Sequence, residues 1–143
     1  MSREAIYAAL FAKVSGSATF KTKSRRFRPF SDVAPADQPA IFQVQGTQSA
    51  EQRRQQGPIW TLRADLFIYY WEPDPNVVPS TGLNTYVDAV EAALAPDAVS
   101  NVQTLGGLVS HCWIEGDVAI FEGTIAEQAV AIIPVNILLG GRP

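Results

Sequence analysis

The stretch IWTLRADLFIYYW at residues 59–71 decides the fold that we predict for this chain. Up to Leu66 its side chains alternate between apolar and polar, which is the pattern of a β-strand with one buried face. From Phe67 to Trp71 the side chains are apolar on both faces. We therefore expect one end of this strand to be covered on one face and the other end to be covered on both.

A second strand is predicted just before this stretch. Residues 40–46, AIFQVQG, alternate apolar and polar side chains as a half-buried strand does. Residues 46–58 hold no large apolar side chain and so cannot contribute to a core. This segment predicts a long exposed loop or the tip of a hairpin.

Two more strands are predicted near the end of the chain. Residues 107–121 and 126–139 are long β-type patterns joined near Glu122. Pro134 lacks an amide proton and cannot donate to a neighbouring strand. We therefore expect the last strand to lie at an edge of the sheet or to carry a bulge at this proline.

Two amphipathic helices are predicted around the central strands. One covers residues 2–14 with Ser2 as its cap, and the other begins at a cap formed by Ser80 or Thr81 and ends at Pro96. Apolar side chains recur at helical spacing in both. They are Ile6, Leu10, Phe11 and Val14 in the first helix, and Leu83, Tyr86, Val87, Val90 and Leu94 in the second. The order of elements predicts an α+β fold, a mainly antiparallel sheet with two helices packed on one face.

Length and composition place the whole chain, residues 1–143, in a single domain. The 143 residues are 47% hydrophobic, which is enough for a core without disulfides or a structural metal. Cys112 is the one cysteine, the first residues match no secretory signal, and no run of about 18 apolar residues is present. We expect a protein of intracellular origin that does not act at a membrane.

The net charge of −3 hides a division along the chain. Residues 1–64 hold ten basic and four acidic side chains, a balance of +6, whereas residues 65–143 hold ten acidic and one basic, a balance of −9. Such an asymmetry indicates interaction surfaces if it survives folding. Complementary faces of neighbouring copies would then attract each other head to tail.

The basic segment TFKTKSRRFRPF at residues 19–30 admits three interpretations. The favoured one is a strand with an exposed basic face whose side chains Phe20, Phe27 and Phe30 are anchored in the core. A nucleic-acid-binding module using residues 21–28 is the second, because cations neutralise phosphates and aromatic rings stack on bases. The sequence pI of about 5.0 weighs against it. The third is a contact with an acidic protein neighbour.

No group of residues predicts catalysis. His111 and Cys112 are adjacent in a predicted strand, so their side chains point to opposite faces and cannot share an ion or a proton. Glu115 and Asp117 share a face and admit a calcium or acid site, although a solvated hairpin end is favoured. We predict a protein that is not an enzyme and that uses no cofactor and no metal.

The order of these pieces resembles the tail terminator proteins, also called tail completion or minor tail proteins, of long-tailed bacteriophages. The resemblance is carried by REAIYAALFAKV, by PAIFQVQG followed by a charged loop and WTLRADLFIYY, by LNTYVDAVEAALAP, and by TLGGLVSHCWIEG with QAVAIIPVNILL. It spans nearly the full chain. It rests on packing patterns, which neck proteins of the same virions share.

The resemblance implies a structural virion protein. Six copies would form a ring that caps the tail tube, ends its polymerisation and offers a joining surface to the head and neck. Its partners would be itself, the tail tube protein and a neck protein, with DNA only as passing cargo. The protein would be made in the bacterial cytoplasm and reside at the tail–neck junction. A head–tail connector of six or twelve copies is the alternative.

Within such a ring, two sets of charged residues are predicted to make contacts. The basic set would reach a neighbouring subunit or the tube, and it consists of Arg25, Arg26, Arg28, Arg53 and Arg54. The acidic set would face a partner or the lumen, and it consists of Asp117, Glu122 and Glu127.

Overall fold

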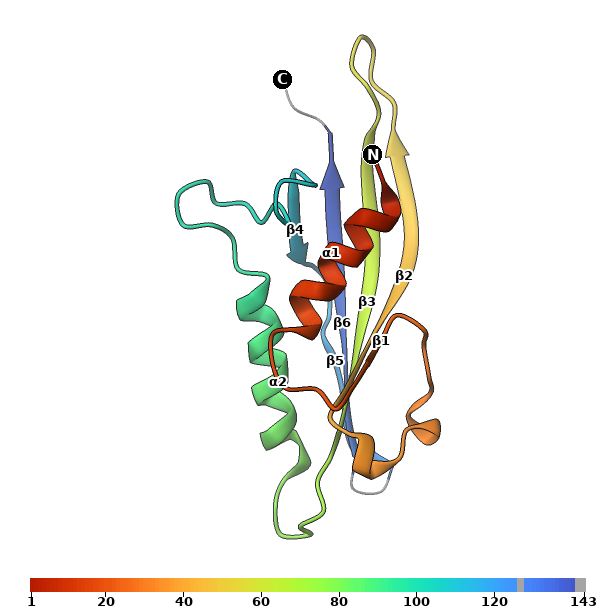
Figure 1. Cartoon of the computed structure of the whole chain (residues 1–143), viewed down its shortest axis with the longest axis vertical. Coiled ribbons are helices and arrows are strands. Elements are labelled where there is room, and N and C mark those ends of the chain that lie inside the picture. The colour runs from red at the N-terminus through yellow and green to blue at the C-terminus, as the bar shows by residue number, and fades with distance from the viewer. Residues whose placement is uncertain (126–127, 141–143) are drawn as a thin grey trace.

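The computed structural model of the chain describes residues 1–125 and 128–140 (Figure 1). It consists of two α-helices, two short 3-10 turns and six strands in one sheet. In chain order these are α1 (Arg3–Ser15), β1 (Thr22–Ser24), the turns Phe30–Asp32 and Pro35–Asp37, β2 (Ala40–Glu51), β3 (Ile59–Trp71), α2 (Pro79–Ala93), β4 (His111–Ile114), β5 (Ala119–Ile125) and β6 (Gln128–Leu139).

The sheet confirms the predicted α+β class. Its strand order is β1-β2-β3-β6-β4, and β5 pairs with β6 beside β4. Only β1 and β2 run parallel, and the remaining pairs are antiparallel. The pairing of β3 with β6 runs from Trp60 opposite Leu139 to Trp71 opposite Gln128. These two strands therefore form the centre of the sheet.

Both helices pack on one face of this sheet, as predicted (Figure 1). Leu62, Leu66 and Ile68 of β3 point to this face and are fully buried beneath them. In β6 the alternate residues from Ala129 to Ile137 do the same. Neither helix of the described chain is long and apolar enough to cross a membrane.

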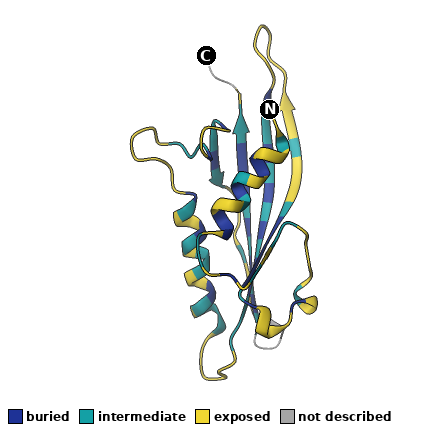
Figure 2. Ribbon diagram, in the orientation of Figure 1, coloured by how far each residue is buried: buried dark blue, intermediate teal, exposed yellow. Residues whose placement is uncertain are grey.

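The two-sided cover predicted for residues 67–71 is present at Tyr69 and only partial at Phe67, which is half-buried. On the face without helices, Tyr69 packs with Phe42, Val33 and Phe30 in a second, smaller cluster. The segment that follows β1 supplies Phe30 and Val33 and thus covers this end of β3 (Figure 2). The far end of β3 has no such cover, which explains why only one of its faces is apolar.

Helix α1 begins where the sequence predicts, and the Oγ atom of Ser2 accepts a hydrogen bond from the Ala5 amide at 3.2 Å. Its predicted stripe is partly wrong, because Tyr7 is fully buried whereas Phe11 is only half-buried. The Tyr7 hydroxyl donates to the carbonyl oxygen of Arg63 at 3.1 Å, which anchors the helix by that side.

Helix α2 starts one residue before the predicted caps. Val78 is its N-cap and Pro79 its first residue, a position where proline is favoured because its fixed φ suits a helix and its missing amide proton is not needed. The expected cap by Ser80 or Thr81 is therefore wrong. Instead, the carboxylate of Glu122 in β5 accepts from the Ser80 amide at 2.7 Å. The buried stripe is confirmed, with Leu83 and Val90 fully buried.

Strand β2 differs from the prediction in two ways. It continues past Gly46 to Glu51, so that only residues 52–58 form the exposed hairpin tip. Its first four residues, 40–43, are all buried instead of alternating. Both faces are covered there, by α1 on one side and by the segment after β1 on the other.

The strand predicted over residues 107–121 is two strands, β4 and β5, separated by Gly116 in the left-handed region at φ 101°. Pro134 lies opposite this break. Its carbonyl oxygen accepts from the Glu115 amide at 3.2 Å, so its missing amide proton faces the gap where β4 has ended and β5 has not begun. Strand β6 is thus an interior strand, and the expected edge or bulge is wrong because the neighbouring strand is interrupted instead.

Candidate subunit-contact surfaces

Within the sheet, the strands of the two oppositely charged halves of the chain lie on opposite sides, whereas α1 of the basic half reaches across to α2. Strands β1 and β2 with the first half of β3 lie on one side, and β6, β4 and β5 with α2 lie on the other (Figure 1). The half with a balance of +6 therefore ends at the β1 edge, and the half with a balance of −9 ends at the β4 and β5 edge. The two ion pairs of the described residues, Arg25–Glu4 and Arg53–Glu51, both lie within the basic half.

Among the described residues, some arginine side chains at the basic edge are engaged in hydrogen bonds within the chain, and others are not. Arg25 donates to Glu4 at 2.5 Å and also contacts Gln45, and its hydrogen bond holds the pKa of the Glu4 carboxyl below its ordinary range. Arg28 donates to the carbonyl oxygen of Asp32 at 2.7 Å. Arg26 is exposed, so it is available to a partner.

Arg53 and Arg54 form a separate patch at the hairpin tip, where both are exposed. Arg53 pairs with Glu51 at 3.3 Å. Arg25 contacts β2 at Gln45, and the six residues from there to Glu51 span about 20 Å in an extended strand. The five predicted basic residues therefore lie in two groups and not on one surface.

The predicted acidic residues have different roles. The Glu122 carboxylate accepts a hydrogen bond from a backbone amide in the first turn of α2, as an N-cap side chain would. Hydrogen bonds from the side chain and backbone of Ser80 lower the pKa of Glu122. Asp117 is exposed in the turn between β4 and β5. Glu127 lies outside the described residues. Of the two acids that the structure describes, Asp117 is the one available to a partner.

The carboxylate of Glu115 is engaged by its own sheet. One oxygen accepts from Nε1 of Trp113 at 3.0 Å and the other from Nδ2 of Asn136 at 2.8 Å. In the part of the chain that the structure describes, no group of three or more His, Cys, Asp or Glu is placed to hold a metal ion. The geometry thus gives Glu115 a structural role.

His111 and Cys112 point to opposite faces, as predicted. Cys112 is fully buried beneath the helices, and burial raises the pKa of its thiol to about 12, which leaves it a poor nucleophile. On the other face the His111 ring stacks on Trp113 with 4.9 Å between centroids, and its Nδ1 atom accepts from the Gln103 amide at 3.1 Å. Both residues therefore make packing contacts within the fold.

The basic segment is not the strand that was favoured, because only residues 22–24 are extended. Phe20 is buried against Tyr86, and Phe30 is half-buried. The anchoring predicted for Phe27 is wrong, because this side chain is 43% exposed. It lies on the face without helices, edge-on to Phe67 with 4.8 Å between the ring centroids.

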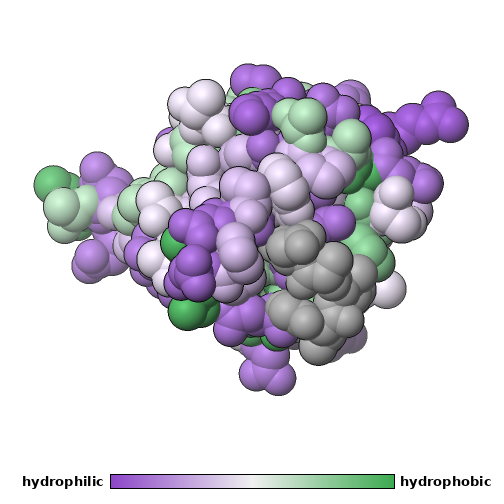
Figure 3. Space-filling view, turned by 90° about the horizontal axis from the view of Figure 1, so that it is seen from below, coloured by the Kyte–Doolittle hydropathy of each residue, from purple (hydrophilic) through white to green (hydrophobic). Residues whose placement is uncertain are grey.

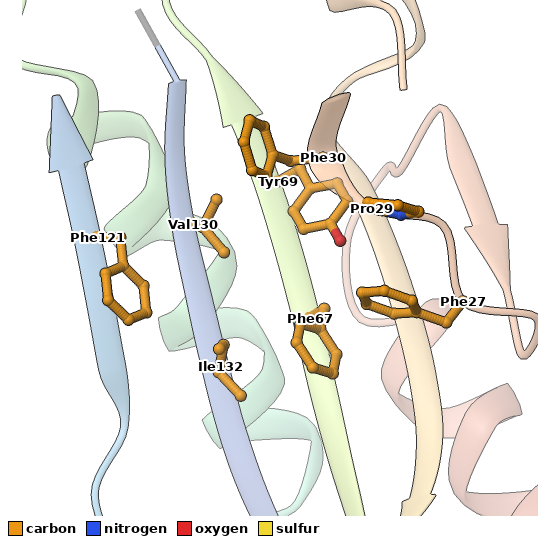
Figure 4. Close-up of a pocket in the computed structure, with 8 residues that line it drawn as sticks. All are labelled: Phe27, Pro29, Phe30, Phe67, Tyr69, Phe121, Val130 and Ile132. Carbon is orange, nitrogen blue, oxygen red and sulfur yellow. The ribbon is translucent and has the colours of Figure 1, made fainter. Parts of the chain in front are cut away.

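An apolar groove of about 310 Å³ opens on this helix-free face (Figure 4). Phe67 and Tyr69 of β3 with Val130 and Ile132 of β6 form its floor, and the Tyr69 hydroxyl donates to the Arg28 carbonyl oxygen at 2.7 Å. Burial raises the pKa of Tyr69 to about 12. The walls are Phe121 on one side and Phe27, Pro29 and Phe30 on the other.

The sequence did not predict this groove. The apolar pattern of residues 67–71 indicates a cover on both faces, but it does not say how far that cover extends. The segment after β1 reaches across β2 and β3 and touches β6 through Gln38 and Gln128, but it leaves Val130 and Ile132 only half-buried. Phe121, in a strand predicted from its pattern alone, is 49% exposed as a result.

No protein-family model matches the chain, and no curated protein matches it in sequence. The resemblance to tail terminator proteins therefore stays a prediction. The candidate features for a function are the two charged edges and the groove.

Proposed function

We propose that this chain is a structural subunit that assembles into a ring, with the basic edge of one copy against the acidic edge of the next. The observation that carries this proposal is the separation of charge across a single sheet. The β1 edge belongs to the half of the chain with a charge balance of +6, and the β4 and β5 edge belongs to the half with a charge balance of −9.

This placement favours one kind of assembly. Opposite edges of one sheet cannot neutralise each other within a copy. A two-fold dimer formed through one edge would bring like charges together, whereas a head-to-tail contact between edges brings opposite charges together and is repeated until the ring closes. Exposed Lys23 and Arg26 on one edge and exposed Asp117, Asp88 and Glu91 on the other are the charges available for it.

The place of the ring comes from the resemblance. We propose that it contains six copies and caps the tail tube of a long-tailed bacteriophage, where it ends tube polymerisation and joins the tail to the neck. The same contacts would serve a head–tail connector, and the position of the protein in virions seen by electron microscopy separates these two assignments.

A nucleic-acid module is less well supported. Phe27 is already in contact with the rings of Phe42 and Phe67, and Arg25 is paired with Glu4. The free cations of the segment are fewer than its sequence suggests.

The test is the mass of the purified full chain, measured by sedimentation velocity, together with ring images by electron microscopy. Rings that dissociate as salt is raised are expected. Arg26→Glu should weaken them, whereas Lys13→Glu, which changes the charge equally on exposed α1, should not. A chain that remains a monomer at every concentration and ionic strength would contradict the proposal.

A further inference from the structure

The groove on the helix-free face exposes apolar surface on both of its walls. Phe27 is 43% exposed and Phe121 49% exposed, and Val130 and Ile132 of β6 lie half-buried between them. Apolar surface of this kind gains free energy when a partner covers it. The occupant should therefore present an apolar side chain.

The chain itself carries a matching projection. The loop between α2 and β4 extends away from the body on the acidic side, and apolar residues lie among polar ones on this projection in the view from below (Figure 3). In this loop Val99 is 93% exposed, the highest value among the exposed large apolar side chains of the described residues.

This loop is held in shape before any contact. The carboxylate of Asp97 accepts from the amides of Val99 at 3.1 Å and Ser100 at 2.9 Å, and these hydrogen bonds lower its pKa. The Asn101 amide donates to the Asp97 carbonyl oxygen at 2.8 Å, with Asn101 itself in the left-handed region. A preformed loop loses little conformational entropy on binding.

Charge fits the loop to the groove. Arg26 and Arg28 are the sequence neighbours of Phe27, and both are exposed, although neither lines the groove itself. The loop carries Asp97, and no basic residue occurs between residues 65 and 141. Two arginines next to a residue that lines the groove attract an acidic loop and orient it.

We propose that the Asp97 loop of one copy inserts Val99 into the helix-free groove of the next copy. This inference rests on the proposed ring and names one of its contacts. The loop leaves the acidic side, and the Phe27 wall belongs to the basic side, so the contact has the same head-to-tail sense.

Two variants test the role of Val99 in association. Val99→Asp places a charge in the groove and should weaken ring association about tenfold or more, since burial of a valine is worth at least that factor. Leu108→Asp is the matched control, because Leu108 is 45% exposed in the next turn and should leave association unchanged. Equal effects of the two variants would overturn the inference.

Cross-linking tests the contact itself. A Val99→Cys chain is mixed with a tagged Phe121→Cys chain, so that a mixed disulfide can form only between copies; native Cys112 is fully buried. A mixed dimer is expected on a non-reducing gel, and a Leu108→Cys chain with the same partner should give none. Rings that form without the mixed dimer and tolerate Val99→Asp overturn this inference and leave the ring proposal standing, whereas an unmutated chain that forms no rings overturns both.

Discussion

Residues that are adjacent in a strand point to opposite faces of the sheet, and the two faces differ in how far they are covered. In β6, Ile133 points to the helices and is fully buried, whereas the adjacent Ile132 lines the open groove. In β3, Leu66 is buried beneath the helices and Phe67 faces the groove. The difference teaches that an apolar strand pattern does not specify a closed core. One face supplies stability, and the other offers apolar surface to a partner.

The largest expected effect is on the free energy of unfolding, and it compares two adjacent residues that lie on opposite faces. Ile133→Ala should lower the free energy of unfolding by about 2–5 kcal/mol, because a fully buried site leaves a cavity. Ile132→Ala should cost about 1 kcal/mol or less, because its side chain borders an open groove. Urea unfolding at one protein concentration measures both. Equal losses would mean that the groove is part of the closed core.

A smaller effect is expected where α2 packs on the covered face. A Cβ atom at Gly82 would overlap the ring of Tyr70, so Gly82→Ala should destabilise the fold by about 1–3 kcal/mol. This cost outweighs the roughly 1 kcal/mol that alanine gains over glycine in a helix. In a Tyr70→Ala background the overlap is gone, and Gly82→Ala should then stabilise the fold. Thermal or urea unfolding of the four chains provides this cycle.

The smallest effect concerns the bond that ties β5 to α2. Hydrogen bonds from Ser80 lower the pKa of Glu122 from its ordinary value of 4.5, so the carboxylate stabilises the fold above that pH, and this contribution is lost as pH falls through the lowered pKa. Glu122→Gln should be less stable than the natural chain near neutral pH, and the difference should shrink in acid. Urea midpoints at several pH values test this, and parallel curves would contradict it.

Much of the fold was predictable from local patterns. The strand at residues 59–71, the cap at Ser2 and the stripe of α2 follow from periodicity and capping, which depend on adjacent residues. The predictions that failed depended on distant partners. The cap of α2 comes from Glu122, and the proline of β6 is accommodated by a break in the next strand.

The candidate site was less predictable. Arg25 and Arg53 appear equivalent in the sequence. In the structure they lie in two separate places, where Arg25 forms an ion pair with Glu4 and Arg53 one with Glu51. Phe27 is apolar and aromatic, which predicts a core position. It is half-exposed beside Phe67 because of the path that the segment after β1 takes. Burial of a side chain depends on what crosses over it, and that is not encoded within a few residues.

The sequence by itself determined the class of fold, the central strand with apolar side chains on both faces at one end, and the division of charge along the chain. Only the tertiary structure decided that this division becomes two opposite edges, because the two halves of the chain lie side by side in one sheet instead of interleaving. It also decided that one face stays open beside β6. Charge and hydrophobicity are properties of residues, whereas a surface is a property of their arrangement.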